Sequence, residues 1–177
     1  MRRGAILVLF ALSAGAAFAQ APSRLTPDAG NVACVGNADD PACATATFFA
    51  CAVRRTAEPC AAVGLDEAPR LIDEGIAVEW LVERATVIRE QDVTDDLKHL
   101  AWFKAGNTLV EAQVRKCAAN LPDCAAESWD DWQIYLAPEG GKFRVVGWRG
   151  DSEPDGPPEI PEAFRPQSPA EAPAPIQ

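Results

Sequence analysis

The chain between residues 39 and 74 carries an apolar pattern with the period of a helix. Asp39-Asp40-Pro41 offers an acidic N-cap followed by a proline suited to the first helical position. From Ala42 to Thr56 the residues at i, i+3, i+4, i+7 and i+8 are Thr45, Phe48, Phe49, Ala52 and Val53. The pattern predicts a helix over 42–56 with this face buried, a short helical piece over 59–63, and one more helical turn over 69–74.

From Ile76 onward the period changes to two, which is typical of half-buried strands. One face of the first such run holds Ile76, Val78, Trp80, Val82, Thr86 and Ile88, and the other holds Glu79, Glu83 and Arg89. Further extended runs are predicted over 97–104, 108–117, 129–136 and 142–149. Pro138-Glu139-Gly140-Gly141 predicts a hairpin between the last two runs.

Helices first and strands afterwards predict an α+β fold, with one or more N-terminal helices packed on a curled antiparallel sheet of about four or five strands. Residues 34–149 are long enough for one hydrophobic core and form the predicted single domain. Residues 20–33 interrupt every periodic pattern and predict a flexible leader. Residues 150–177 hold eight prolines, six acids and one base, a composition that predicts a disordered Pro-rich acidic tail.

The N-terminus has the pattern of a cleavable export signal. Arg2 and Arg3 precede the short apolar run Gly4–Ala17, and Ala17-Phe18-Ala19 is an A-x-A cleavage site. We expect cleavage after Ala19 and a periplasmic or secreted mature chain that begins at Gln20. The apolar run is shorter than the roughly 20 residues that cross a bilayer, so no membrane span is predicted in the mature chain.

Export predicts that the six cysteines form disulfides, because an oxidising compartment preserves such bonds. Cys43 and Cys51 lie about 12 Å apart along the predicted helix, beyond the reach of a disulfide. Cys117 and Cys124 flank a six-residue turn and are expected to pair. Two sets remain for the other four, Cys34–Cys43 with Cys51–Cys60 or Cys34–Cys51 with Cys43–Cys60. The first set is favoured because it ties each helix end to the adjacent chain.

The net charge is −10, and loss of Arg2 and Arg3 with the signal would make it −12. This acidity argues against nucleic acids and anionic membrane surfaces as partners. The sequence has no glycine-rich phosphate loop, calcium loop or metal-ligand cluster, so we predict no cofactor and no metal.

The last predicted strand reads Lys142-Phe143-Arg144-Val145-Val146-Gly147-Trp148. With the helical N-terminal part and the long strand before it, the outline resembles the cone-shaped α+β roll of the ketosteroid isomerase, SnoaL-like and nuclear transport factor superfamily. That resemblance covers about residues 40–149 and implies a mainly apolar pocket between helix and sheet. The stretch between the first helix and Ile76 is shorter than the further long helix of that superfamily.

The candidate functional residues are few. If the implied pocket exists, His99 is a candidate general base, with Asp95 or Asp131 as its carboxylate partner. The neighbours Asp96 and Asp130 are expected on the opposite strand faces. Trp129 and Trp132 are candidate binding residues, because three-residue spacing in a strand places one of them on the exposed face.

These observations favour an exported envelope protein that binds a small apolar ligand or another envelope protein without catalysis. A small cone-fold enzyme that isomerises or cyclises an apolar substrate, with His99 and a nearby aspartate, is the alternative. A third hypothesis assigns partner binding to the tail itself, which would dock on an aromatic groove of another protein.

Overall fold

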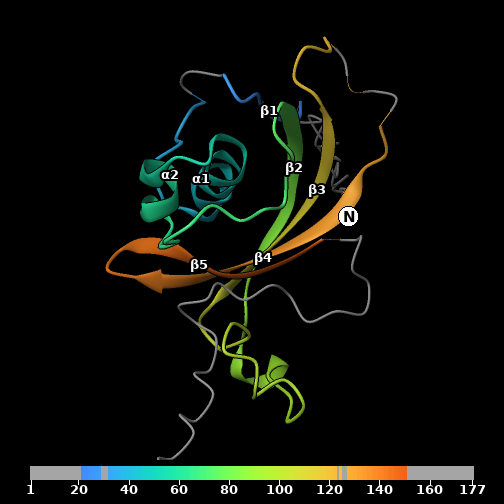
Figure 1. The fold of residues 1–177 in the computed structure, drawn as a ribbon. Helices are drawn as coiled ribbons and strands as arrows, with labels where there is room; N and C mark the ends of the chain where they lie inside the picture. The colour runs from blue at the N-terminus through green and yellow to red at the C-terminus, as the bar shows by residue number, and fades with distance from the viewer. Residues whose placement is uncertain (1–20, 29–31, 123, 125–126, 151–177) are drawn as a thin grey trace, which may run out of the picture.

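The computed structural model describes residues 21–28, 32–122, 124 and 127–150 (Figure 1). The expected signal peptide, Gln20 and residues 151–177 of the expected tail lie outside the described residues. The elements, in chain order, are β1 (Ser23–Leu25), α1 (Pro41–Arg54), α2 (Ala57–Ala62), β2 (Ile76–Val87), the 3-10 turn η1 (Glu90–Asp92), β3 (Thr108–Ala118), β4 (Asp130–Glu139) and β5 (Lys142–Gly150).

The fold is α+β, with two helices packed against an open five-stranded sheet in the part of the chain that the structure describes. The strand order is β1-β2-β3-β4-β5 and every neighbouring pair is antiparallel. Both helices lie on one side of the twisted sheet (Figure 1). This confirms the predicted class and the meander of the last strands.

Helix α1 forms where its sequence signals predict it. The Asp40 carboxylate accepts hydrogen bonds from the N–H groups of Ala42 (2.9 Å) and Cys43 (3.0 Å). The helix ends at Arg55, whose left-handed backbone (φ 51°) lets its N–H reach the carbonyl of Cys51. The observed bounds, 41–54, differ from the predicted ones by one or two residues at each end.

The buried face of α1 meets the sheet through aromatic rings. Phe48 and Phe49 are fully buried, and their centroids lie 5.3 Å from Trp148 and 5.2 Å from Trp80, respectively. Trp132 lies edge-on to Phe49 at 5.9 Å. Burial of each phenylalanine contributes about 1.5–3 kcal/mol, so this layer anchors the helix to strands that are distant in sequence. The rings occupy the interface between helix and sheet in which the superfamily resemblance implied a pocket.

Strand β2 is continuous, but its face pattern changes partway along. The register with β3 shifts between Val82 and Arg84, which marks a β-bulge. Val82 pairs with Ala112, whose side chain belongs to the main core on the helix side of the sheet. Thr86 pairs with Leu109, whose side chain lies on the opposite, outer face of the sheet. The prediction that Thr86 and Ile88 share a face with Val82 is therefore wrong, because one extra residue reverses the alternation.

Residues 88–107 form a loop that packs on the outer sheet face, so the predicted strand over 97–104 is wrong. This segment contains turns, and its Trp102 packs against Tyr135 at 4.3 Å between ring centroids. The side-chain amide of Asn107 donates to the carbonyl of Trp102 at 2.8 Å. Strands β2 and β3 pair directly with each other, which leaves no position between them for another strand.

Two other expectations are corrected. The predicted leader contains strand β1, whose Leu25 is fully buried, so the chain joins the sheet before Cys34. Pro22 and Pro27 flank this short strand rather than preventing it. Residues 69–74 are not helical: Ile72 is buried there, and its carbonyl accepts a hydrogen bond from the Arg55 side chain at 2.7 Å. That side-chain bond anchors the backbone without helical hydrogen bonds.

The six cysteines form the favoured set of disulfides. The pairs are Cys34–Cys43, Cys51–Cys60 and Cys117–Cys124, with Cα separations of 5.3, 4.7 and 5.7 Å. The first two tie the beginning and the end of α1 to adjacent chain, and α2 carries Cys60. The third closes the turn between β3 and β4. The predicted short helix over 59–63 is present as α2, beginning two residues earlier.

Candidate functional site

A cavity of about 250 Å³ lies at the edge of the sheet, between the first half of α1 and β2. Helix α1 contributes Ala42 and Ala46, and β2 contributes Trp80, Leu81 and Val82. The remaining walls come from segments on either side of the turn after β1, namely from Ala21, Ser23, Val32, Ala33 and Cys34. Ala42 and Ala46 lie one helical turn apart, and their small side chains leave this space open beside the larger side chains of β2.

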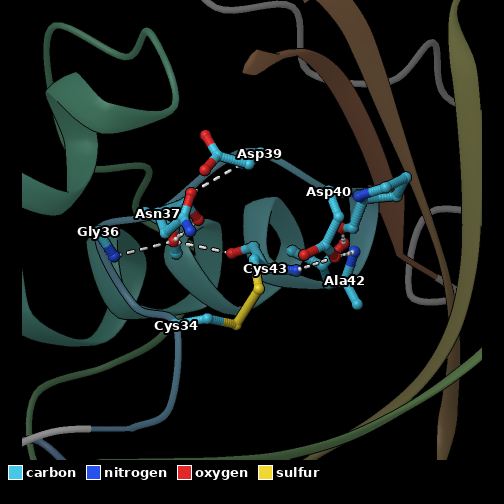
Figure 2. The surroundings of a disulfide bond; sticks show 10 residues. Cys34, Gly36, Asn37, Asp39, Asp40, Ala42 and Cys43 are labelled. Atoms are coloured by element: carbon cyan, nitrogen blue, oxygen red, sulfur yellow. Dashed lines mark hydrogen bonds between the residues drawn. A yellow bond between two sulfur atoms is a disulfide. The ribbon is translucent and has the colours of Figure 1, made fainter. Parts of the chain in front are cut away.

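The disulfide Cys34–Cys43 holds the wall next to α1 in place. Figure 2 shows Cys34 joined to Cys43 in the first turn of the helix, close to the Asp40 cap and Ala42. The Thr47 hydroxyl accepts a hydrogen bond from the Gly36 N–H at 3.0 Å, which secures the backbone just after Cys34. A disulfide and a hydrogen bond therefore hold this wall in place, so a ligand would meet a preformed surface.

The side chains that line the cavity are mostly apolar, whereas polar and apolar atoms contribute about equally to its surface. None of its described lining residues carries an ionisable side chain, since Cys34 is in a disulfide, and Ser23 supplies the one hydroxyl among them. A group bound here would be held by apolar contact and by the backbone. Acid–base chemistry needs a titratable group within hydrogen-bond reach of the reacting atoms, and this lining offers none.

The structure places the candidate catalytic residues away from this cavity. His99 and Asp95 are exposed in the 88–107 loop, where the Asp95 carboxylate accepts a 2.6 Å hydrogen bond from Lys98. Asp131 is exposed on β4, at the position that pairs with Gln113. A hydrogen bond from Thr94, with smaller contributions from its own backbone and from His99, lowers the pKa of Asp96. None of these four residues lines the cavity.

The two candidate tryptophans have different environments. Trp132 is 4% exposed and belongs to the ring layer under α1, with the Lys116 ammonium 5.6 Å from its ring centroid. Trp129 is half-buried, just before β4, and the Arg115 guanidinium lies 4.5 Å from its centroid. Of the two, only Trp129 is positioned to contact a partner at the surface.

The outer sheet face also carries a charged cluster that sequence reasoning missed. Glu79 is 7% exposed and lies between Arg24 of β1 (3.3 Å) and Arg115 of β3 (2.7 Å). Arg24 also donates to the carbonyls of Leu121 (2.6 Å) and Pro122 (3.3 Å). The cluster ties β1 to the disulfide turn after β3. Its contacts are satisfied within the protein, which favours a structural role over ligand binding.

In the described ranges no group of three or more His, Cys, Asp or Glu side chains could hold a metal ion. Across the same ranges no helix is long and apolar enough to cross a membrane.

The sequence contained a weak signal for the cavity. Ala21, Val32 and Ala33 are apolar residues within the segment that we expected to be a flexible leader. Their spacing matches neither a helix nor a strand, so periodicity could not assign them to a wall. They line the cavity because Cys34 is bound to α1 and because β1 pairs with β2, and the second of these contacts is long-range.

Comparison with known proteins does not add to this picture: no family model, curated protein or solved structure matches the chain.

Proposed function

We propose that the mature chain is an exported, non-catalytic binding module, and that the cavity between α1 and β2 takes an apolar group of a small ligand or of a protein partner. The observation that carries this proposal is the lining: alanine, valine, leucine and tryptophan side chains around a volume of about 250 Å³, with no ionisable group among the described lining residues. The three disulfides fit an oxidising compartment, as the expected export signal does.

Native mass spectrometry on protein purified from the envelope of its own host tests the small-ligand form of the proposal. An extra mass that is lost on denaturation would reveal a bound ligand. Ala46→Leu should abolish that extra mass, because Ala46 is 5% exposed and its enlarged side chain would fill the cavity. Ala57→Leu is the matched control, since Ala57 is exposed at the start of α2.

The outcomes separate the possibilities. An extra mass in wild type and Ala57→Leu that is absent from Ala46→Leu would assign the ligand to the cavity. An extra mass retained by Ala46→Leu would contradict the cavity as the binding site. A wild-type chain without extra mass would exclude a tightly held small ligand. The protein partner would then remain as the occupant of the cavity, and the sheet edge beside the cavity provides a specific test of it.

A further inference from the structure

Strand β1 covers only part of the edge of β2. The pairs are Ser23 with Trp80, Arg24 with Glu79 and Leu25 with Val78. Beyond Trp80, β2 pairs with β3 alone among the described residues. In the part of the chain that the structure describes, the edge of β2 after the bulge, residues 84–87, therefore has no second strand partner. We call it the open edge.

The backbone groups that point out of the open edge can be assigned. Ile88 donates its N–H to Asn107 (2.8 Å) and accepts from the Gly106 N–H (2.9 Å), so its polar groups point toward β3. Because this direction alternates along a strand, the N–H and C=O groups of Val87 and Ala85 point away from β3. They are the groups that an added strand would meet.

The side chains of the open edge do not protect it. Val87 is 56% exposed, and Ala85 and Thr86 are exposed as well. The charged member, Arg84, forms an ion pair with Glu111 of the neighbouring strand β3. Edge strands in soluble proteins are commonly blocked by lysine, proline or a covering loop. Here, the described residues supply a bulge at one end of the edge and leave Ala85 and Val87 accessible.

The cavity lies between the Ser23 end of β1 and the open edge, since Ser23, Trp80 and Val82 all line it. Small-molecule pockets usually measure roughly 300–1,000 Å³, so about 250 Å³ is small for a whole ligand of that class. The volume suits a single apolar side chain instead. A strand added to the open edge would end beside this cavity and could insert such a side chain.

We propose that an extended segment of a partner protein adds to the open edge as a strand and places an apolar side chain in the cavity. This inference rests on the proposed function, for which it names the partner class. The edge already takes a strand intramolecularly, as β1, and the proposed segment continues that interface. Main-chain hydrogen bonds would supply affinity, and the cavity would supply selectivity for an apolar residue.

Two other occupants of the edge fit less well. A second copy carries the same net charge of −10, which opposes association. The chain's own segment 151–177 has eight prolines, and its longest proline-free stretch is Glu162–Arg165. Such a segment cannot supply a regular series of N–H donors to a strand.

The test uses the full mature chain and a display library of random nine-residue peptides as the probe. We expect selected peptides to carry apolar residues at alternate positions and to slow amide hydrogen exchange at Ala85 and Val87 by about tenfold or more. Ala85→Pro removes an outward N–H without removing a bond to β3 and should weaken peptide binding about tenfold or more. Ala46→Leu should weaken it similarly, whereas Ala57→Leu should bind as wild type does.

Several results would overturn the inference. They are the absence of selected peptides, selected peptides that bind Ala85→Pro as they bind wild type, and peptide binding without protection of Ala85 and Val87. Amides already protected in the free chain would also overturn it: protection lost on dilution would identify a second copy, and protection lost on deletion of 151–177 would identify the tail. If a small ligand is lost from Ala46→Leu while no peptide binds, this inference fails and the proposed function stands.

Discussion

Glu79 is the residue whose charge contributes most visibly to the fold. The residue is 7% exposed, and its carboxylate lies between the side chains of Arg24 and Arg115, which belong to the strands on either side of β2. Removing one member of a buried ion pair leaves its partners desolvated and uncompensated, which costs more than the pair itself contributes. This single carboxylate therefore links side chains of three adjacent strands.

We expect Glu79→Gln to lower the free energy of unfolding by about 3 kcal/mol, because two arginines lose their shared counter-charge. Urea denaturation of the purified protein measures this change. Glu111→Gln is the matched control on the same face: its partner Arg84 is largely exposed, so the expected loss is below about 1 kcal/mol. Equal losses in the two variants would contradict a special role for Glu79.

Tyr135 is the only tyrosine in the chain, so its ionisation can be followed without interference. It packs against Trp102 beneath the 88–107 loop, and its hydroxyl donates to the Gln133 side chain at 2.9 Å. Burial, which disfavours the phenolate, raises the pKa of Tyr135 to about 12.

The absorbance of tyrosinate in a pH titration should therefore rise near pH 12 in the folded protein and near pH 10 in denaturant. The folded pKa lies above the unfolded one, so this group's contribution to stability is fully present below about pH 10 and is lost as the pH rises toward 12. A folded-state midpoint near 10 would show that the loop does not cover the ring.

At the scale of elements, α1 depends on signals at its ends that can be tested individually. Asp40→Ala should destabilise the protein by about 1 kcal/mol, because two N–H groups of the first turn lose their acceptor. Thermal or urea unfolding measures the difference. Asp39→Ala is the control, since Asp39 is exposed and the cap bonds go to Asp40. A larger effect at Asp39 would place the cap one residue earlier.

The elements also show which structural features can be predicted from the sequence. The start of α1 was predictable because capping is local: Asp40 and Pro41 act within one turn. Its end was predicted two residues too late, because the left-handed conformation of Arg55 has no glycine to signal it. The bulge after Val82 was not predictable, because its position depends on the pairing partners in β3. The same holds for 97–104, whose apolar residues pack on Tyr135 and Val146 of other strands rather than forming a strand.

At the scale of the whole molecule, three disulfides and a small aromatic core support the fold. Each disulfide spans seven or nine residues of sequence separation, for which the chain-entropy model gives about 2–2.5 kcal/mol. The Cys117–Cys124 bridge also shapes the turn whose carbonyls bind Arg24, so it supports β1 as well as its own turn.

Mass spectrometry of the exported, unreduced protein should give the mass of a chain beginning at Gln20 and lacking six hydrogens, two for each disulfide. Reduction should restore those hydrogens. An unreduced mass that already includes those six hydrogens would contradict the disulfides. A mass that corresponds to a different N-terminus would contradict cleavage after Ala19.

The double variant Cys117→Ser with Cys124→Ser should lose about 2 kcal/mol of stability in urea denaturation. It should also increase hydrogen exchange in β1, because Arg24 loses its fixed carbonyl acceptors. Unchanged exchange in β1 would show that the turn keeps its shape without the bridge.

The sequence by itself determined the features that depend on neighbouring residues: helix α1 and its N-cap, the alternation that predicts β2 to β5, and the preference for pairing cysteines close in the chain. Tertiary structure alone decided that β1 joins the sheet, that a bulge moves Thr86 and Ile88 to the outer face, and that a cavity opens beside α1. The reason is physical: local signals act through backbone geometry over a few residues. The cavity and the open edge depend instead on what distant segments cover, and a single sequence does not reveal those contacts.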